Sequence, residues 1–198
     1  MSMRTWIAGG LLASAFALPA AAHPLTFVGT LSNAGEATQQ NPSLGTGSVT
    51  VVFDDDAFTM SVTTSFSSLS GTTTASHIHC CTGAPDLGSA GVATQLPSFA
   101  GFPLGVTAGT YHHDFDLTQA SSWNPAFITA NGGTVNSAFA ALSTGINAGK
   151  AYLNIHTSFA TGGEIRAFLH AAPVPEPGTW ALTLAGLALL GATRRRRA

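Results

Sequence analysis

The chain has 198 residues, a formal net charge of −2 and only 8% charged side chains. Five of its seven basic residues lie outside residues 23–172, and that segment keeps two basic and eight acidic side chains, a net charge of −6. This acidic segment of about 150 residues is long enough for one domain with a single core, and its charge argues against nucleic-acid binding.

Residues 1–22 have the three-part pattern of a secretory signal peptide. Arg4 is the one charged residue, an uncharged stretch runs from Trp6 to Leu18, and Ala20-Ala21-Ala22 follows. Small residues after an apolar stretch are typical of a cleavage site. We therefore predict cleavage after Ala22, with the folded domain over residues 23–172 and a separate C-terminal signal over 173–198.

Apolar residues then alternate with polar ones in seven short segments, as is typical of strands. We expect strands at 25–31, 48–53, 57–66, 72–81, 110–117, 151–157 and 164–170. Asp54, Asp55 and Asp56 separate the second and third of these. Three carboxylates suggest calcium, but the spacing of a calcium-binding loop is missing, so a hairpin turn is the favoured interpretation.

Two helices are expected between the fifth and sixth strands. Asn124 followed by Pro125 is a typical helix start, and residues 131–133 would end that helix. A second helix is expected from Val135 to Thr144, capped by Thr134 and ended by Gly145. Together these elements predict an all-β protein: an antiparallel, Greek-key-like β-sandwich of about seven to eight strands with a short helical crossover insertion.

The C-terminal residues have three parts in a fixed order. An uncharged, mostly apolar run of about 16 residues, 178–193, separates a proline-containing motif, Pro175, Glu176 and Pro177, from the arginine cluster Arg194, Arg195, Arg196 and Arg197. These parts resemble the PEP-CTERM sorting signal of Gram-negative bacteria that make extracellular polysaccharide. The resemblance implies recognition and cleavage by an exosortase, a membrane cysteine transpeptidase.

Arginines at both ends favour a topology with both termini in the cytoplasm and the domain outside. The apolar run is shorter than the roughly 20 residues of a membrane-spanning helix, although arginine side chains can extend it. We therefore expect a transmembrane helix that anchors the chain in the inner membrane transiently. An ordinary C-terminal membrane anchor is the other interpretation.

The central domain contains three short motifs: His77-Ile78-His79, Asn154-Ile155-His156-Thr157 and Gly162-Gly163-Glu164-Ile165-Arg166. With these motifs, the segment resembles the CHRD domain, first described in chordin and widespread in bacteria. The likeness spans most of residues 25–170 and is strongest in the second and third motifs. The resemblance implies an extracellular β-domain with no established enzymatic activity. The adjacent cysteines after His79 occur in a bacterial subset only.

Strand alternation predicts where the histidines of these motifs point. If Ile78 faces the core, His77 and His79 face outward together, and the same rule turns His156 outward on another strand. Glu164 and Arg166 are expected on this face too. Three imidazoles so placed could chelate copper or zinc. The other interpretation is a hydrogen-bonded outer patch in which Glu164 pairs with Arg166 or with a histidine.

Cys80 and Cys81 are the two cysteines of a chain that is expected to enter an oxidising compartment. A disulfide between adjacent residues is our first expectation, although the geometry of neighbouring residues disfavours it. The other interpretation is a pair of thiolates beside the histidines, which would favour Cu(I). No catalytic residue is predicted, because no orienting partner for a cysteine nucleophile can be named.

Taken together, the sequence predicts an exported, non-enzymatic binding or structural module of the bacterial cell surface or extracellular polysaccharide matrix. The expected partners are an exosortase, the inner membrane and either exopolysaccharide or surface proteins, with no nucleic acid. No cofactor is expected beyond the copper or zinc of the histidine hypothesis. The other functions considered are a periplasmic or surface copper- or zinc-binding protein and a superoxide-dismutase-like oxidoreductase.

Overall fold

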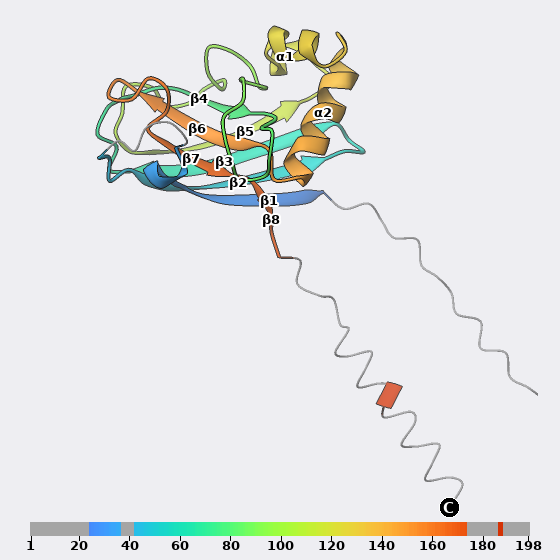
Figure 1. The fold of residues 1–198 in the computed structure, drawn as a ribbon, viewed down its shortest axis with the longest axis horizontal. Helices are drawn as coiled ribbons and strands as arrows, with labels where there is room; N and C mark the ends of the chain where they lie inside the picture. Colours follow the sequence, from blue (N-terminus) through green and yellow to red (C-terminus); the bar gives the residue numbers. More distant parts are fainter. Residues whose placement is uncertain (1–23, 37–41, 174–185, 188–198) are drawn as a thin grey trace, which may run out of the picture.

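The computed structural model describes residues 24–36, 42–173 and 186–187. Eight strands, two α-helices and two 3-10 helices follow one another in these residues (Figure 1). In chain order they are β1 (Leu25–Ser32), η1 (Asn33–Gly35), β2 (Thr46–Asp54), β3 (Thr59–Ser67), β4 (Thr73–His79), β5 (Gly109–Asp116), η2 (Ala120–Ser122), α1 (Pro125–Ala130), α2 (Val135–Asn147), β6 (Tyr152–Thr157), β7 (Ile165–Phe168) and β8 (His170–Ala171).

The strands form one antiparallel, strongly curled sheet. Seven of them follow the order β4-β6-β7-β1-β2-β3-β5, and the short β8 pairs with β1. The predicted mostly β, antiparallel fold with a small helical insertion is confirmed. The two layers of the predicted sandwich belong to one hydrogen-bonded sheet, which curls over its own core. Strands distant in sequence, such as β4 and β6, thereby become neighbours.

The aspartate segment between β2 and β3 forms the predicted hairpin turn. A side-chain oxygen of Asp54, Oδ1, accepts hydrogen bonds from the backbone amides of Asp56 (3.1 Å) and Ala57 (2.8 Å). Such a side-chain-to-backbone turn is a common use of aspartate. The three carboxylates are exposed or half-exposed, and the turn itself accounts for the residue type at Asp54.

Both helices begin at the predicted caps. The Asn124 side chain accepts from the Ala126 amide, and the Thr134 side chain accepts from the Ser137 amide. The predicted end of α2 at Gly145 is wrong, since the helix continues to Asn147. Gly145 instead allows close packing, because a side chain at this position would collide with the sulfur atoms of Cys80 and Cys81, which pack against the helix.

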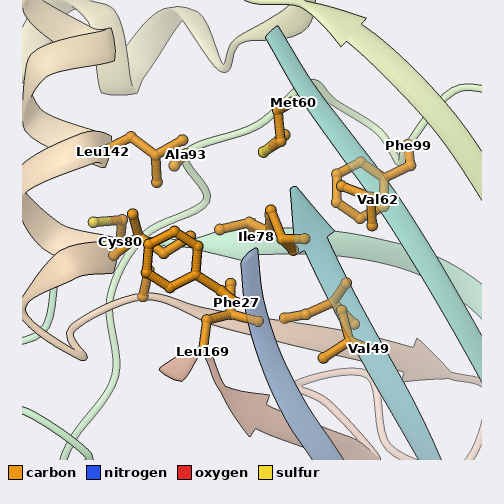
Figure 2. Close-up of a cluster of buried hydrophobic side chains, with 14 of the residues drawn as sticks. Phe27, Val49, Met60, Val62, Ile78, Cys80, Ala93, Phe99, Leu142 and Leu169 are labelled. Carbon is orange, nitrogen blue, oxygen red and sulfur yellow. The ribbon is translucent and has the colours of Figure 1, made fainter. Parts of the chain in front are cut away.

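The concave side of the curled sheet holds the apolar core. Figure 2 shows side chains from strands, loops and α2 converging on one space. Ile78 and Val62 are completely buried there, and Leu142 of α2 closes the space from the helical side. Because Ile78 points into this core, the residues before and after it must point to the opposite face of β4.

The predicted signal peptide and sorting signal lie outside the described residues, apart from a short helical piece at residues 186–187. No helix in the part of the chain that the structure describes is long and apolar enough to cross a membrane. The signal peptide and the transmembrane helix therefore stay predictions from the sequence.

Candidate metal centre

Three histidines from two neighbouring strands meet on the outer face of the sheet. His77 and His79 lie on β4, and His156 lies on β6. The antiparallel register pairs His77 with Asn154 and Ala75 with His156, so that the three imidazoles form a triangle. Their ring centroids are 5.2 to 5.8 Å apart, and one ring nitrogen of each lies within 4.8 Å of one from each of the others. We call these three residues the histidine triad.

The sequence led us to expect outward-facing histidines that solvent can reach. The structure differs, because the triad is not displayed to solvent. His77 and His79 are only 5% and 8% exposed, and His156 is half-buried. The cause is the long connection between β4 and β5, which returns along the edge of β4 and bridges His79 with Val92. A rule of strand alternation gives the side of the sheet on which a residue lies, but it does not show what covers that side.

Each imidazole of the triad is held by one backbone carbonyl oxygen. His77 Nε2 donates to the Pro97 oxygen (2.7 Å), His79 Nδ1 to the Ala90 oxygen (3.0 Å) and His156 Nδ1 to the Thr161 oxygen (2.9 Å). A carbonyl only accepts, so these nitrogens carry the protons. The remaining nitrogens, His77 Nδ1, His79 Nε2 and His156 Nε2, are buried and have no hydrogen-bond partner.

Burial keeps the three imidazoles neutral. It lowers the pKa of His77 and of His79 to about 4, although the hydrogen bonds to Pro97 and Ala90 act in the opposite direction. Burial likewise lowers the pKa of His156. At neutral pH each ring is therefore uncharged and presents an unprotonated nitrogen, which is the form that binds a metal.

An aromatic and cationic layer supports one side of the triad. The Tyr152 ring stacks on His79 with centroids 4.9 Å apart and planes 5° from parallel, and its hydroxyl accepts from the Ala90 amide (3.1 Å). The Arg166 guanidinium lies 4.6 Å from the centre of the Tyr152 ring. Arg166 also donates to the carbonyl oxygens of Gly35 and Gly88, and so ties two loops to this face.

Glu36 is the acidic partner of Arg166. Its carboxylate lies 4.0 Å from the guanidinium, and both side chains are almost fully buried. Burial raises the pKa of Glu36 to about 7, against the lowering effect of Arg166. The predicted polar face therefore contains a carboxylate paired with Arg166, but the sequence analysis did not identify Glu36 as a member of it.

Glu164 lies elsewhere than expected. It precedes the first residue of β7, where strand alternation does not apply, and its carboxylate accepts from the side chains of Ser43 and Thr157 and from the amides of Ser70 and Gly71. Burial alone would raise the pKa of Glu164, but these hydrogen bonds outweigh it and lower the pKa. Glu164 thus fastens three segments together beside the core.

Cys80 and Cys81 form a disulfide across a cis peptide bond. The Cys80 side chain is buried in the apolar core (Figure 2), and strand alternation places this core on the other side of β4 from the triad. The pair therefore supplies no thiolate to the histidines in this structure.

The triad fits a transition metal chemically. Imidazole nitrogens suit copper and zinc, and histidine ligands usually donate their second nitrogen to a carbonyl or carboxylate, as all three do here. Metal–nitrogen bonds of about 2.0 Å would place the nitrogens roughly 3.3 Å apart. Because the nitrogens lie within 4.8 Å of one another, they would need to approach by up to about 1.5 Å. No carboxylate or thiol belongs to this group in the part of the chain that is described.

The family model of the CHRD domain matches residues 27–169, well over half of the chain. The chain belongs to the CHRD domain family. A second model, the PEP-CTERM protein-sorting motif, matches residues 173–197. This motif marks an exported protein associated with the cell envelope and is consistent with processing by an exosortase. No curated protein and no solved structure matches the chain.

The residues of this CHRD domain that sequence reasoning missed are those that orient the ligands. Strand alternation places Tyr152 outward with His156, but nothing in the sequence indicates that its ring stacks on His79. The carbonyls of Ala90, Pro97 and Thr161 left no signal, since any residue type supplies a carbonyl and the loops that carry them have no periodic pattern.

Proposed function

We propose that this CHRD protein is an exported metal-binding protein that holds copper or zinc at His77, His79 and His156. One observation carries the proposal: three neutral imidazoles have ring nitrogens within 4.8 Å of one another, each ring has one buried nitrogen without a hydrogen-bond partner, and each ring is fixed by a carbonyl. Metal-binding histidines usually donate their second ring nitrogen to such a partner, which holds the metal-binding nitrogen in place before a metal binds.

A purely structural histidine patch explains this arrangement less well. A buried acceptor without a partner costs about 1–3 kcal/mol, and there are three of them here. The three rings offer no donor to one another, because each N–H group is used by a carbonyl. One buried water has two hydrogens to donate and would leave an acceptor unsatisfied, whereas one metal ion can satisfy all three.

A second function is compatible with metal binding: a structural or binding module of the cell surface or polysaccharide matrix. The PEP-CTERM motif supports delivery to the envelope. The outer faces of β2, β3 and β5 also form a shallow groove lined with hydroxyl groups, including Ser48, Ser65 and Thr110. Hydroxyls can hydrogen-bond to a neutral polysaccharide. Loss of surface or matrix attachment on deletion of residues 173–198 would support this function, and unchanged attachment would oppose it.

The same protein is proposed to bind metal without catalysing a reaction. The three free nitrogens are buried from solvent, and this supports binding more than turnover of a substrate at the metal. We expect a copper-loaded protein to dismutate superoxide no faster than the same protein without metal. An activity that follows the copper content and disappears in the triad variants would support the oxidoreductase instead.

The direct test is metal analysis of the full chain as the host cell exports it, after loading with copper or zinc and removal of the excess. We expect one metal ion per wild-type chain and almost none in His77→Ala and His156→Ala. His112→Ala is the matched control, because His112 lies on β5, outside the triad, with a 61% exposed side chain. The proposal fails if wild type and both triad variants emerge equally free of metal.

A further inference from the structure

We infer that the triad selects a monovalent ion, Cu(I), over divalent ions such as Zn(II). The inference rests on the proposed metal site and concerns the charge of the ion that it accepts. It follows from the charges in and around the triad.

The ligands themselves contribute no charge. The triad consists of three neutral imidazoles, and no carboxylate or thiol of the described residues joins it. The cysteines nearest in sequence, Cys80 and Cys81, are joined in a disulfide and cannot act as thiolates. An ion bound here therefore keeps its full charge, one unit for Cu(I) and two for Zn(II).

The surroundings make each unit of charge unfavourable. The free nitrogens are buried, and the rings are covered by the connection between β4 and β5. The cost of removing an ion from water rises with the square of its charge, so a divalent ion is disfavoured about four times as strongly as a monovalent one. Divalent sites usually offset this cost with anionic ligands, which the triad does not provide.

Arg166 adds a fixed positive charge close to the triad. Its guanidinium lies 4.6 Å from the Tyr152 ring, which in turn stacks 4.9 Å from His79. Repulsion grows in proportion to the charge of the bound ion. The Glu36 carboxylate lies 4.0 Å from the guanidinium and compensates part of its positive charge.

Coordination number acts in the same direction. Zinc in proteins takes four ligands, and a site with three protein ligands normally adds a water. Cu(I) is a soft ion with a filled d shell that accepts three ligands. Three histidine nitrogens therefore satisfy Cu(I), whereas zinc needs a fourth ligand that no other histidine, cysteine or carboxylate of the described residues supplies.

The experiment compares dissociation constants for Cu(I) and Zn(II) in the full chain as it is exported. Each metal is competed against a coloured chelator, and Cu(I) is kept reduced with ascorbate under anaerobic conditions. Wild type is expected to bind Cu(I) on the order of a hundredfold more tightly than Zn(II). Ag(I), which needs no reductant, serves as a second monovalent probe.

Two matched pairs of variants test the cause. Arg166→Gln removes the guanidinium charge and should shift the affinity ratio toward Zn(II) by about tenfold. Arg166→Lys changes the shape of the side chain but keeps the charge, so its ratio should stay near that of wild type. Glu36→Gln, measured at pH 8 where this carboxyl is largely ionised, should shift the ratio the opposite way.

The outcomes separate this inference from the site itself. Tight binding of Zn(II) that equals or exceeds that of Cu(I) overturns the inference and leaves the metal site intact. Equal shifts in Arg166→Gln and Arg166→Lys overturn the electrostatic cause. Failure to bind Cu(I), Ag(I) and Zn(II) alike refutes the proposed function, provided that the disulfide and the circular dichroism spectrum match those of a folded chain.

Discussion

Strands β4 and β6 have two buried faces with opposite chemistry. On the inner face, Ile78, Leu153 and Ile155 are completely buried in the apolar core. On the outer face, the same strands carry the histidine triad, which loops cover almost as well. One face buries carbon against carbon, and the other buries nitrogens that need specific partners.

The two faces depend on the rest of the chain in different ways. Apolar burial is non-directional, so the inner face needs only neighbours of suitable volume. The outer face needs individual carbonyls at hydrogen-bond distance, and these come from the connections at residues 80–108 and 158–164. We therefore expect the inner face to supply most of the stability, whereas the outer face depends on a few individual hydrogen bonds.

The largest expected effect is on the inner face. Ile78→Ala should lower the free energy of unfolding by about 2–5 kcal/mol, because it leaves a cavity in a closely packed core. The folded fraction should still bind metal, since Ile78 is buried in the core, on the face of β4 opposite to the triad. Urea denaturation beside His77→Ala measures the contrast. A larger loss in His77→Ala than in Ile78→Ala would mean that the outer face carries the stability.

This contrast also explains what the sequence could predict. The inner face repeats every second residue, so Ile78, Leu153 and Ile155 identify both the strands and their orientation. The grouping of His77, His79 and His156 follows from the same period. Their burial does not, because it depends on a connection without periodicity, and Glu164 was misplaced because it precedes its strand. The end of α2 was misjudged because Gly145 serves packing against a disulfide.

The second prediction concerns acid. The triad should make the metal-free protein lose stability between pH 7 and pH 4, because His77 and His79 take up protons near pH 6.5 when unfolded but only near pH 4 when folded. The unfolded chain thus binds more protons in this window. Each of these two histidines contributes about 3 kcal/mol by this linkage.

Glu36 acts in the opposite direction. Its pKa of about 7 in the folded protein exceeds the ordinary value of 4.5, so the folded state binds more protons over that range and gains stability on acidification. Glu36 offsets about one histidine, which leaves a net loss of about 3 kcal/mol. Denaturation at pH 7, 5.5 and 4 should show a steeper loss in Glu36→Gln. A flat profile in both proteins would contradict the assigned burial of the triad.

The third prediction is a slightly smaller effect, stabilisation by the metal. An ion that binds only the folded state, present at 100 times its dissociation constant, adds about 2.7 kcal/mol. Thermal unfolding with and without Cu(I) should show this gain in wild type and in the control His112→Ala. His79→Ala should show none. A gain of equal size in His79→Ala would place the metal outside the triad.

The smallest expected effect separates the two supports that Tyr152 gives to His79. Tyr152→Phe keeps the ring that stacks on His79 but removes the hydroxyl that accepts from the Ala90 amide, a loss of about 1 kcal/mol in stability. The Ala90 carbonyl also orients His79 Nδ1, so metal affinity should fall severalfold, toward the lower end of the roughly 10–100-fold loss that is typical when a group orienting a metal ligand is removed. Tyr152→Leu removes the stack as well and should weaken Cu(I) binding further. If Tyr152→Phe and Tyr152→Leu both bind Cu(I) as tightly as wild type, the loop carbonyls alone position the imidazole. The aromatic layer would then serve only the packing of the outer face.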